Sequence, residues 1–283
     1  MPIEHISDTA RWVAVYRAME SERPDAIFRD PFARRLAGAR GEEIVRTLQR
    51  GRSTAWAMIV RTAVFDEIIR HAVDERAVDT VVNLAAGLDT RPWRMELPSD
   101  LHWVDVDLPA ILAYKADALR GETPRCRYQA IATDLTDDAA RGALFAKLGA
   151  GSTRALVVTE GLLIYLTAAK VEALARDLHA QSSFAQWLID LANPWLLKYM
   201  NKSWGQAAAQ GNAPFRFAPA EGTAFFEPSG WREVEFRSSM EEAHRLHREM
   251  KLAWLWRSLG RLSSRKRREE TRRISGSVLL EHM

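Results

Sequence analysis

The stretch Val81–Arg91, with the sequence VVNLAAGLDTR, decides the fold. An apolar run typical of a buried strand leads into small residues and a single glycine, Gly87. Glycine permits a tight turn and lets the backbone approach a ligand closely. In parallel α/β sheets, ligands bind in the crevice beyond the carboxyl ends of the strands. The stretch therefore predicts a strand whose end faces a bound small molecule.

Strand-like and helix-like segments alternate along the middle of the chain. Short apolar runs predict strands at Thr80–Leu84, His102–Val106, Tyr128–Ala132, Ala155–Thr159 and Trp187–Leu191. Segments of helical character lie between them, at Pro109–Leu119, Asp138–Leu148 and Ala168–Ala180. This alternation predicts a doubly wound parallel sheet with helices on both faces.

The two ends of the chain complete the expected architecture. Residues 1–75 read as helices, and we expect them to form an N-terminal helical cap. Residues 76–283 would form a ligand-binding α/β domain with a helical insertion at about 193–225. Arg232–Phe236 and Ser275–Leu280 predict two late strands, which would make a seven-stranded sheet with an antiparallel edge.

Composition places the chain among ordinary globular proteins. Of its 283 residues, 47% are hydrophobic and 27% are charged. The single cysteine, Cys126, allows no internal disulfide, so a cytoplasmic location is expected. The first residues lack the apolar stretch of a secretory signal, and no apolar run reaches about 18 residues, so we expect no contact with a membrane.

Positive charge is concentrated near the carboxyl end of the chain. The formal net charge is +3, and Arg261–Arg273 holds seven Lys/Arg against two Glu, a local +5 that leaves about −2 (3 − 5) elsewhere. Such a segment can touch phosphate or an acidic partner, but a solvated helix face is the favoured interpretation. One patch on a near-neutral body does not indicate a nucleic-acid-binding protein.

Acidic residues follow the second predicted strand. Asp105 lies 18 residues after Gly87, and Asp107 points the same way if the strand persists through both. A carboxylate at this position can accept hydrogen bonds from ribose hydroxyls. The alternative for Asp107 is a capping role at the helix that starts near Pro109.

Polar residues also end the third and fourth strands. Asp134 can reach an adenine amino group while Leu135 supplies a backbone amide and an apolar wall; alternatively, Asp134 is a turn residue. Glu160 ends the fourth strand and would face the reaction centre, where it could hold an ammonium group. Tyr165 follows five residues later and could line the same pocket.

The loop after the first strand argues against a dinucleotide. It lacks the G-x-G-x-x-G pattern that cradles a pyrophosphate. A single glycine leaves room for a cofactor without that group, such as S-adenosylmethionine (SAM). Arg61, on the long helix before the sheet, could pair with the SAM carboxylate in a bidentate manner.

The segment Asn83–Arg91 resembles the G-x-G-x-D-T-R loop of the leucine carboxyl methyltransferase family, which includes bacterial polyketide carboxyl O-methyltransferases. Further strings that resemble this family are Arg61-Thr62, Asp105–Pro109, Asp134-Leu135 and Glu160–Leu166. The resemblance covers nearly the whole chain. It implies an α/β, class I, Rossmann-like SAM methyltransferase fold with a seven-stranded doubly wound sheet.

The resemblance also implies roles for single residues. Arg61, helped by Arg11, would hold the SAM carboxylate, and Glu160 would lie near the SAM amino group. The predicted cofactor-binding residues are Arg61, Ala85, Ala86, Gly87, Asp105, Val106, Asp107, Asp134, Leu135 and Glu160. This sequence departs from the family pattern at Ala85, where the family often has glycine. The methyl group of Ala85 narrows the space in which the backbone approaches the cofactor.

The predicted function is SAM-dependent O-methylation of a carboxylate, or of a phenolic hydroxyl, on a small metabolite such as a polyketide, with S-adenosylhomocysteine (SAH) as product. A carboxylate acceptor needs no general base, and no histidine ends a predicted strand. Glu160 and Tyr165 are the predicted catalytic residues, and no metal is expected. The predicted substrate-binding residues are Arg11, Trp12, Tyr16, Tyr165, Trp195 and Tyr199.

Two other functions stay open at this stage. The chain could methylate a protein C-terminal carboxylate, or it could be a non-catalytic partner protein with a SAM-binding fold. An NAD(P)-dependent oxidoreductase is disfavoured, because the glycine-rich loop is missing. The acceptor itself and the oligomeric state cannot be read from the residues.

Overall fold

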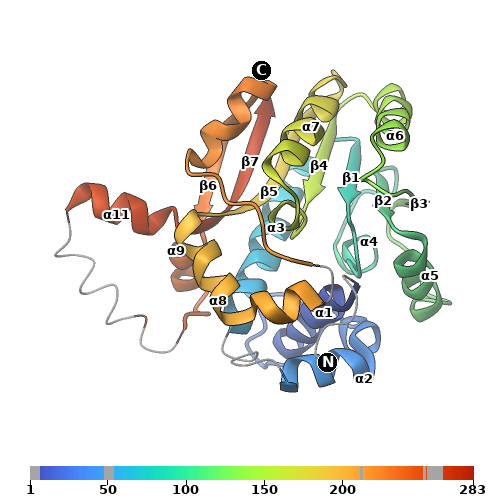
Figure 1. Cartoon of the computed structure of the whole chain (residues 1–283). Helices are drawn as coiled ribbons and strands as arrows, with labels where there is room; N and C mark the ends of the chain where they lie inside the picture. Colours follow the sequence, from blue (N-terminus) through green and yellow to red (C-terminus); the bar gives the residue numbers. More distant parts are fainter. Residues whose placement is uncertain (1–6, 48–53, 211–212, 251–252, 254–263) are drawn as a thin grey trace.

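Seven strands form one sheet in the computed structural model, which describes residues 7–47, 54–210, 213–250, 253 and 264–283 (Figure 1). Their order is β3-β2-β1-β4-β5-β7-β6. The strands are β1 (Thr80–Leu84), β2 (His102–Asp107), β3 (Arg127–Ala132), β4 (Ala155–Thr159), β5 (Phe184–Ala192), β6 (Trp231–Ser238) and β7 (Ser275–His282).

The direction of the strands follows the prediction. Strands β1 to β5 pair in parallel, whereas β7 is antiparallel to both β5 and β6. The predicted bounds of β1 and β4 are confirmed, and β5 begins three residues earlier than predicted, at Phe184. Because the chain runs outward from β1 to β3 and then returns to β4, the strand order reverses between β1 and β4. Ligands bind at such switch points in open α/β sheets.

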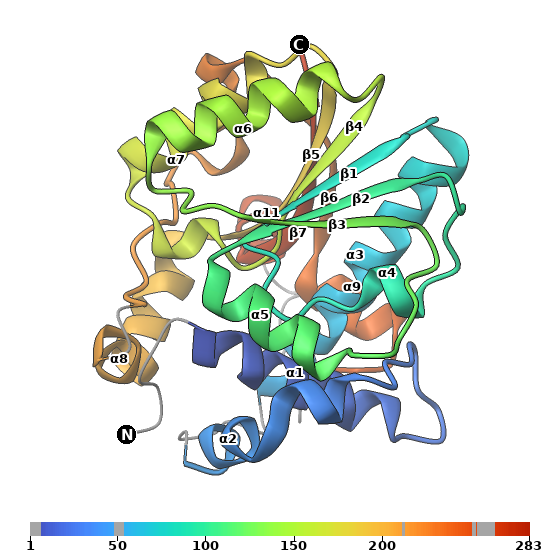
Figure 2. The ribbon, with the colours of Figure 1, turned by 90° about the vertical axis from the view of Figure 1, so that its right-hand side faces the viewer.

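Helices cover both faces of the sheet (Figure 2). They are α1 (Ser7–Ser21), α2 (Ala33–Thr47), α3 (Ala55–Glu75), α4 (Arg91–Arg94), α5 (Pro109–Ala118), α6 (Asp138–Ala150), α7 (Ala168–His179), α8 (Pro194–Gln210), α9 (Ser239–Arg245) and α11 (Arg265–Arg272). Two 3₁₀ helices, η2 (Leu163–Tyr165) and η3 (Gly222–Ser229), join them. Helices α6 and α7 share one core with β1 and β4, and α3 packs on the opposite face. The doubly wound prediction is confirmed.

Helices α1, α2 and α8 gather at the lower end of the molecule in Figure 1, opposite the C-terminus. A buried arginine ties α1 to the sheet: Arg17 donates to Asp30 (2.8 Å) and to the carbonyl of Leu88 (2.5 Å). Thr90 donates to the same Asp30 carboxylate at 2.7 Å. Helix α1 and the segment before α2 are therefore fastened to the loop that follows β1.

The predicted helical insertion at about 193–225 contains α8. The division into a cap at 1–75 and a domain at 76–283 stays a prediction, and α3 itself packs against the sheet. Within the described residues, no helix has both the length and the hydropathy needed to cross a membrane. The basic segment forms the exposed helix α11, as expected of a solvated face, while Arg261 lies outside the described residues.

Candidate active site

The loop after β1 has two residues in the left-handed region. Ala85 has φ +53° and Gly87 has φ +52°. A Cβ on Gly87 would lie 3.2 Å from the Cβ of Ala10 on α1, so glycine is needed there for space as well as for geometry. The Ala86 amide donates to the Val106 carbonyl at 3.2 Å. The predicted ligand-facing loop is thus held between α1 and the end of β2.

Asp105 lies beneath this loop and is fully buried. Its Oδ1 accepts hydrogen bonds from Asn83 Nδ2 (3.0 Å) and Trp103 Nε1 (2.9 Å). Its Oδ2 accepts from Lys115 Nζ (2.5 Å) and from the Tyr128 hydroxyl (2.9 Å). With both oxygens occupied inside the protein, Asp105 does not fit the predicted role of ribose ligand. The side chain of Val106 is buried too and offers a ligand only its backbone.

Asp107 is the carboxylate at the end of β2 that remains partly exposed. It accepts hydrogen bonds from the amides of Gly87 (2.6 Å) and Leu108 (2.7 Å). Burial raises the pKa of Asp107, and these two hydrogen bonds offset only part of that effect. Asp107 therefore fixes the loop and can also present its carboxylate to a bound hydroxyl.

A cluster of ion pairs lies at the carboxyl ends of β4 and β5. Glu160 Oε1 accepts a hydrogen bond from Arg61 Nε at 3.0 Å, and Glu160 Oε2 pairs with Arg91 Nη2 at 2.8 Å. Arg61 Nη1 also donates to Asp190 Oδ2 at 3.1 Å. The structure thus brings together Arg61 and Glu160, which were predicted from segments 99 residues apart. Both side chains keep 14% of their surface exposed.

Arg91 extends this cluster into the interior. It donates to Asp66 at 2.7 Å and to Asp89 at 2.6 Å. Burial alone would raise the pKa of Asp89, but the positive charges of Arg91, Lys115 and Arg94 outweigh it and lower the pKa. Asp89 consequently remains ionised near neutral pH.

Sequence reasoning missed Asp190 and the role of Arg91. Asp190 is the one charged residue in the apolar strand β5, which was a usable signal. Arg91 ends the stretch that decided the fold, but its partner Asp66 lies on α3. A contact between segments so far apart has no signature in one sequence.

Asp134 follows β3 and is exposed. Its Oδ1 accepts hydrogen bonds from the Thr136 amide (2.9 Å) and the Thr136 hydroxyl (2.7 Å), which is the turn role considered above. Leu135 packs partly buried against the core, and its carbonyl accepts from Arg141. The predicted adenine contacts of both residues stay predictions.

Tyr165, in η2, lies close to Arg61. Burial raises its pKa, although the charge of Arg61 and a hydrogen bond with the Thr9 side chain lower it in part. The ring packs 5.7 Å from the ring of Phe215. Tyr165 therefore joins η2 to α1 beside the ion-pair cluster and keeps its phenolic proton at neutral pH.

The residues of α1 that were predicted to bind substrate mostly contact other parts of the protein. Tyr16 has no exposed surface and packs in the core between α1 and α2, so it does not fit a role in substrate binding. Trp12 packs edge-on against it at 6.0 Å. The Arg11 guanidinium lies 3.7 Å from the centroid of the Tyr114 ring on α5. Its predicted contacts with the SAM carboxylate and with a substrate stay predictions.

The predicted aromatic residues on α8 are exposed. Trp195 has 62% and Tyr199 has 39% of its surface accessible, and their rings stack 6.1 Å apart with an angle of 11°. Exposed aromatic rings of this kind are common at binding surfaces. Their contact with a substrate stays a prediction.

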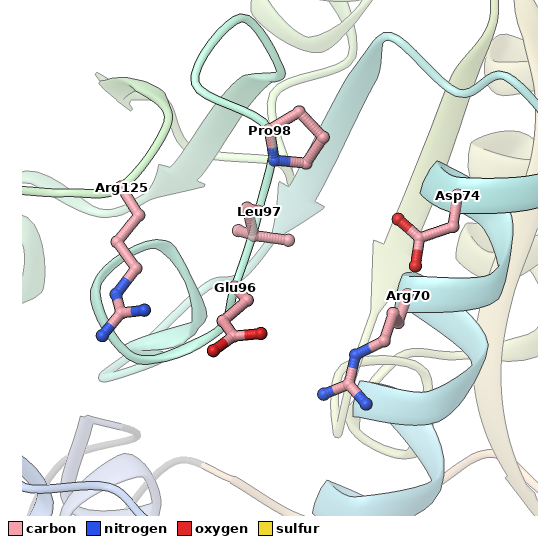
Figure 3. Close-up of a pocket in the computed structure, with 6 residues that line it drawn as sticks. All are labelled: Arg70, Asp74, Glu96, Leu97, Pro98 and Arg125. Carbon is pink, nitrogen blue, oxygen red and sulfur yellow. The ribbon is translucent and has the colours of Figure 1, made fainter.

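A polar hollow of about 480 Å³ lies elsewhere (Figure 3). It is lined from α3 and from the segments that precede β2 and β3, by Arg70, Asp74, Glu96, Leu97, Pro98 and Arg125. These segments lead into the amino ends of the strands. The hollow is therefore separate from the cluster at the carboxyl ends.

The family model for leucine carboxyl methyltransferase matches residues 10–179. This chain belongs to the leucine carboxyl methyltransferase family. The matched segment includes Arg61, the loop after β1, Asp107, Asp134 and Glu160. It ends before Asp190 and α8.

Proteins of two Streptomyces species are similar to about three fifths of this chain. A protein of Streptomyces coelicolor, provisionally named an S-adenosyl-L-methionine-dependent methyltransferase, is 38% identical over 187 residues, which cover 62% of this chain. A Streptomyces avermitilis protein with the same provisional name is 36% identical over 62% of the chain. The chain spans 65% of the length of each relative, slightly under two thirds.

Two crystal structures share the fold over almost the whole chain. A DUF574-family protein of Streptomyces avermitilis has a TM-score of 0.63 at 13% identity, with 97% of each chain covered. A Thermobifida fusca protein, provisionally described as a methyltransferase, has a TM-score of 0.62 at 14% identity and covers 100% of this chain and 96% of its own. At such identities the likeness shows the fold, and it confirms the predicted class I, Rossmann-like architecture.

Proposed function

We propose that this chain transfers a methyl group from SAM to a carboxylate oxygen of a small metabolite. The observation that carries the proposal is the placement of Glu160 between Arg61 and Arg91, at the strand ends that also hold Asp107. Membership of the leucine carboxyl methyltransferase family and the names of its actinobacterial relatives support it.

The residues at these strand ends fit the parts of SAM. Its amino-acid end carries both a carboxylate and an ammonium group, and Arg61 and Glu160 offer one partner to each. Asp107 can accept hydrogen bonds from ribose hydroxyls, because its remaining lone pairs lie at the partly exposed end of β2. Asp134 and Leu135 remain the candidates for the adenine ring.

The acceptor is expected to arrive as an anion. Burial raises the pKa of Tyr165, so this phenol is not a base near neutral pH. Among the described residues, no histidine hydrogen-bonds or pairs with Glu160, Asp190 or Tyr165. A carboxylate acceptor needs no proton removed, whereas an alcohol or phenol does.

Bound SAM supplies an electrophilic methyl group on a sulfonium. The acceptor oxygen forms its bond to the methyl carbon in line with the carbon–sulfur bond, which breaks and leaves its electron pair on sulfur. The products are a methyl ester and SAH, and no proton moves. The protein's share is to hold the two reactants within about 3 Å of each other and to exclude water.

A panel of matched acceptors tests the proposal. The protein is incubated with methyl-labelled SAM and with an aromatic carboxylic acid, its primary amide or the corresponding phenol. Mild alkali then releases labelled methanol from a methyl ester but not from an aryl methyl ether. We expect label to be incorporated with acids only and to be alkali-labile. Alkali-stable label, or transfer to the phenols alone, would overturn the carboxylate proposal.

A further inference from the structure

Asp190, near the end of β5, contacts two parts of the candidate site at once. Its Oδ1 accepts a hydrogen bond from the Gly161 amide at 2.6 Å, and its Oδ2 accepts from Arg61 Nη1 at 3.1 Å. Gly161 directly follows Glu160 in the turn after β4. One carboxylate therefore fixes both the turn that carries Glu160 and the arginine on α3.

We propose that Asp190 is a positioning residue for the amino-acid end of SAM, an inference that rests on the proposed function. Asp190 orients Arg61 directly and Glu160 through the Gly161 amide, while Arg61 and Glu160 stay paired with each other at 3.0 Å. Its side chain is 24% exposed, against 14% for Arg61 and Glu160, so it lies at the outer edge of the cluster.

The turn and the guanidinium are in close contact. Gly161 has φ +68°, a left-handed conformation that favours glycine. A Cβ at this position would lie 3.2 Å from Arg61 Nη1 and 3.4 Å from Arg61 Nη2. The turn therefore lies against Arg61 with little room for a side chain, and Asp190 accepts hydrogen bonds from both sides of this contact.

The hydrogen-bonding geometry of Arg61 explains why Asp190 is needed beside Glu160. A guanidinium has five N–H donors in a fixed plane and binds carboxylates best in a bidentate manner. Arg61 donates its Nε to Glu160 Oε1 and its Nη1 to Asp190 Oδ2, while Glu160 Oε2 pairs with Arg91. Without Asp190, Arg61 keeps Glu160 as an anionic partner but loses the contact that fixes its Nη1 end, so its guanidinium can turn. The orientation that Arg61 presents to a ligand carboxylate would then be lost.

Binding of two related ligands distinguishes a positioning role of Asp190 from a general effect of its mutation on folding. SAH contains the amino-acid end, whereas 5′-methylthioadenosine has the same adenosine and sulfur without it. For Asp190→Asn we expect the Kd of SAH to rise roughly tenfold to a hundredfold, as when a charge-assisted hydrogen bond is lost. The Kd of 5′-methylthioadenosine should change by less than about twofold.

A matched control uses another aspartate that pairs with a helix arginine. Asp177 on α7 pairs with Arg141 on α6, away from the cluster, so Asp177→Asn should leave both Kd values unchanged. Gly161→Ala perturbs the same contact from the turn side and should weaken SAH selectively, as Asp190→Asn does. Thermal unfolding of each variant establishes that it is folded.

Each outcome decides the inference. Selective loss of SAH affinity in Asp190→Asn and in Gly161→Ala supports it. Unchanged SAH binding in Asp190→Asn overturns it and leaves the proposed function standing. Equal loss of both ligands overturns it as well, because Asp190 would then only support the fold. If the wild-type protein binds neither ligand, the proposed function fails together with the inference.

Discussion

Asp107 accepts a 2.6 Å hydrogen bond from the amide of Gly87, so the last residue of β2 holds the loop that follows β1. Asp105, two residues earlier on the same strand, is sealed beneath that loop by Lys115 and Tyr128. The two carboxylates have the same charge and neighbouring positions but different surroundings. Mutation of Asp107 should therefore mainly change ligand affinity, whereas mutation of Asp105 should mainly change the stability of the fold.

Asp107→Asn should weaken ligand binding and also loosen the loop after β1, because the side-chain amide keeps only one of the two oxygens that accept from Gly87 and Leu108. If Asp107 accepts from ribose hydroxyls, its loss raises the Kd of SAH about tenfold or more. The Kd of 5′-methylthioadenosine should rise by the same factor, since both ligands contain the ribose. Fluorescence titration of the two ligands measures this. A loss confined to SAH would place Asp107 at the amino-acid end instead.

Asp105→Asn should lower stability, because it leaves the ammonium group of Lys115 buried without its anion. Removing one partner of a buried ion pair costs about 3–5 kcal/mol. Urea unfolding measures the free energy, with Asp117→Asn, in an exposed pair with Arg120, as the control that should be nearly neutral. A stable Asp105→Asn protein with lost SAH affinity would restore Asp105 as a ligand.

Ala85→Gly should be tolerated although it introduces a glycine. Ala85 has φ +53°, and a left-handed residue other than glycine costs about 1–2 kcal/mol. Relief of that cost offsets the greater freedom of glycine in the unfolded chain, about 0.4–1 kcal/mol. We expect unchanged or higher stability and an equal or lower Kd for SAH. The neighbouring Ala86→Gly, whose φ is ordinary, should be destabilising; equal losses in both variants would contradict this account.

Acid should weaken the fold through Asp66. Burial would raise the pKa of Asp66, but the charges of Arg94 and Arg91 outweigh it, and its pKa lies below the ordinary 3.8. A lowered native pKa gives stability that is fully present above the ordinary pKa and is lost as pH falls through the native pKa. Urea unfolding between about pH 5 and pH 2 should show this loss, reduced in Asp66→Asn. Asp74→Asn, exposed on the same helix, should keep the wild-type slope.

The sequence predicted the strands of the sheet well, because a buried strand is visible as a short run of apolar residues. The bounds of β1 follow from one apolar run that ends in small residues. The same runs could not show that Asp105 is buried and Asp107 partly exposed, because side chains two residues apart on a strand point to the same side. What buries Asp105 comes from α5 and β3, through Lys115 and Tyr128.

Aromatic residues on helices were harder to assign. Tyr16 reads as a candidate for a pocket, but it is fully buried in a core that α1 shares with α2, α3, α4 and α5. The apolar spacing of α1 does not reveal which helix will pack on which side. Asp190 was missed for the opposite reason: its charge was visible within an apolar strand, but its partners Arg61 and Gly161 come from distant segments.

The most direct test of the central claim is calorimetric titration of the purified protein with SAM and SAH, with NADH as the control ligand. The account predicts saturable binding of SAM and SAH with one site per chain and no heat with NADH. Absence of heat with both SAM and SAH, in protein shown to be folded, would contradict a cofactor site at the ends of β1, β2 and β4.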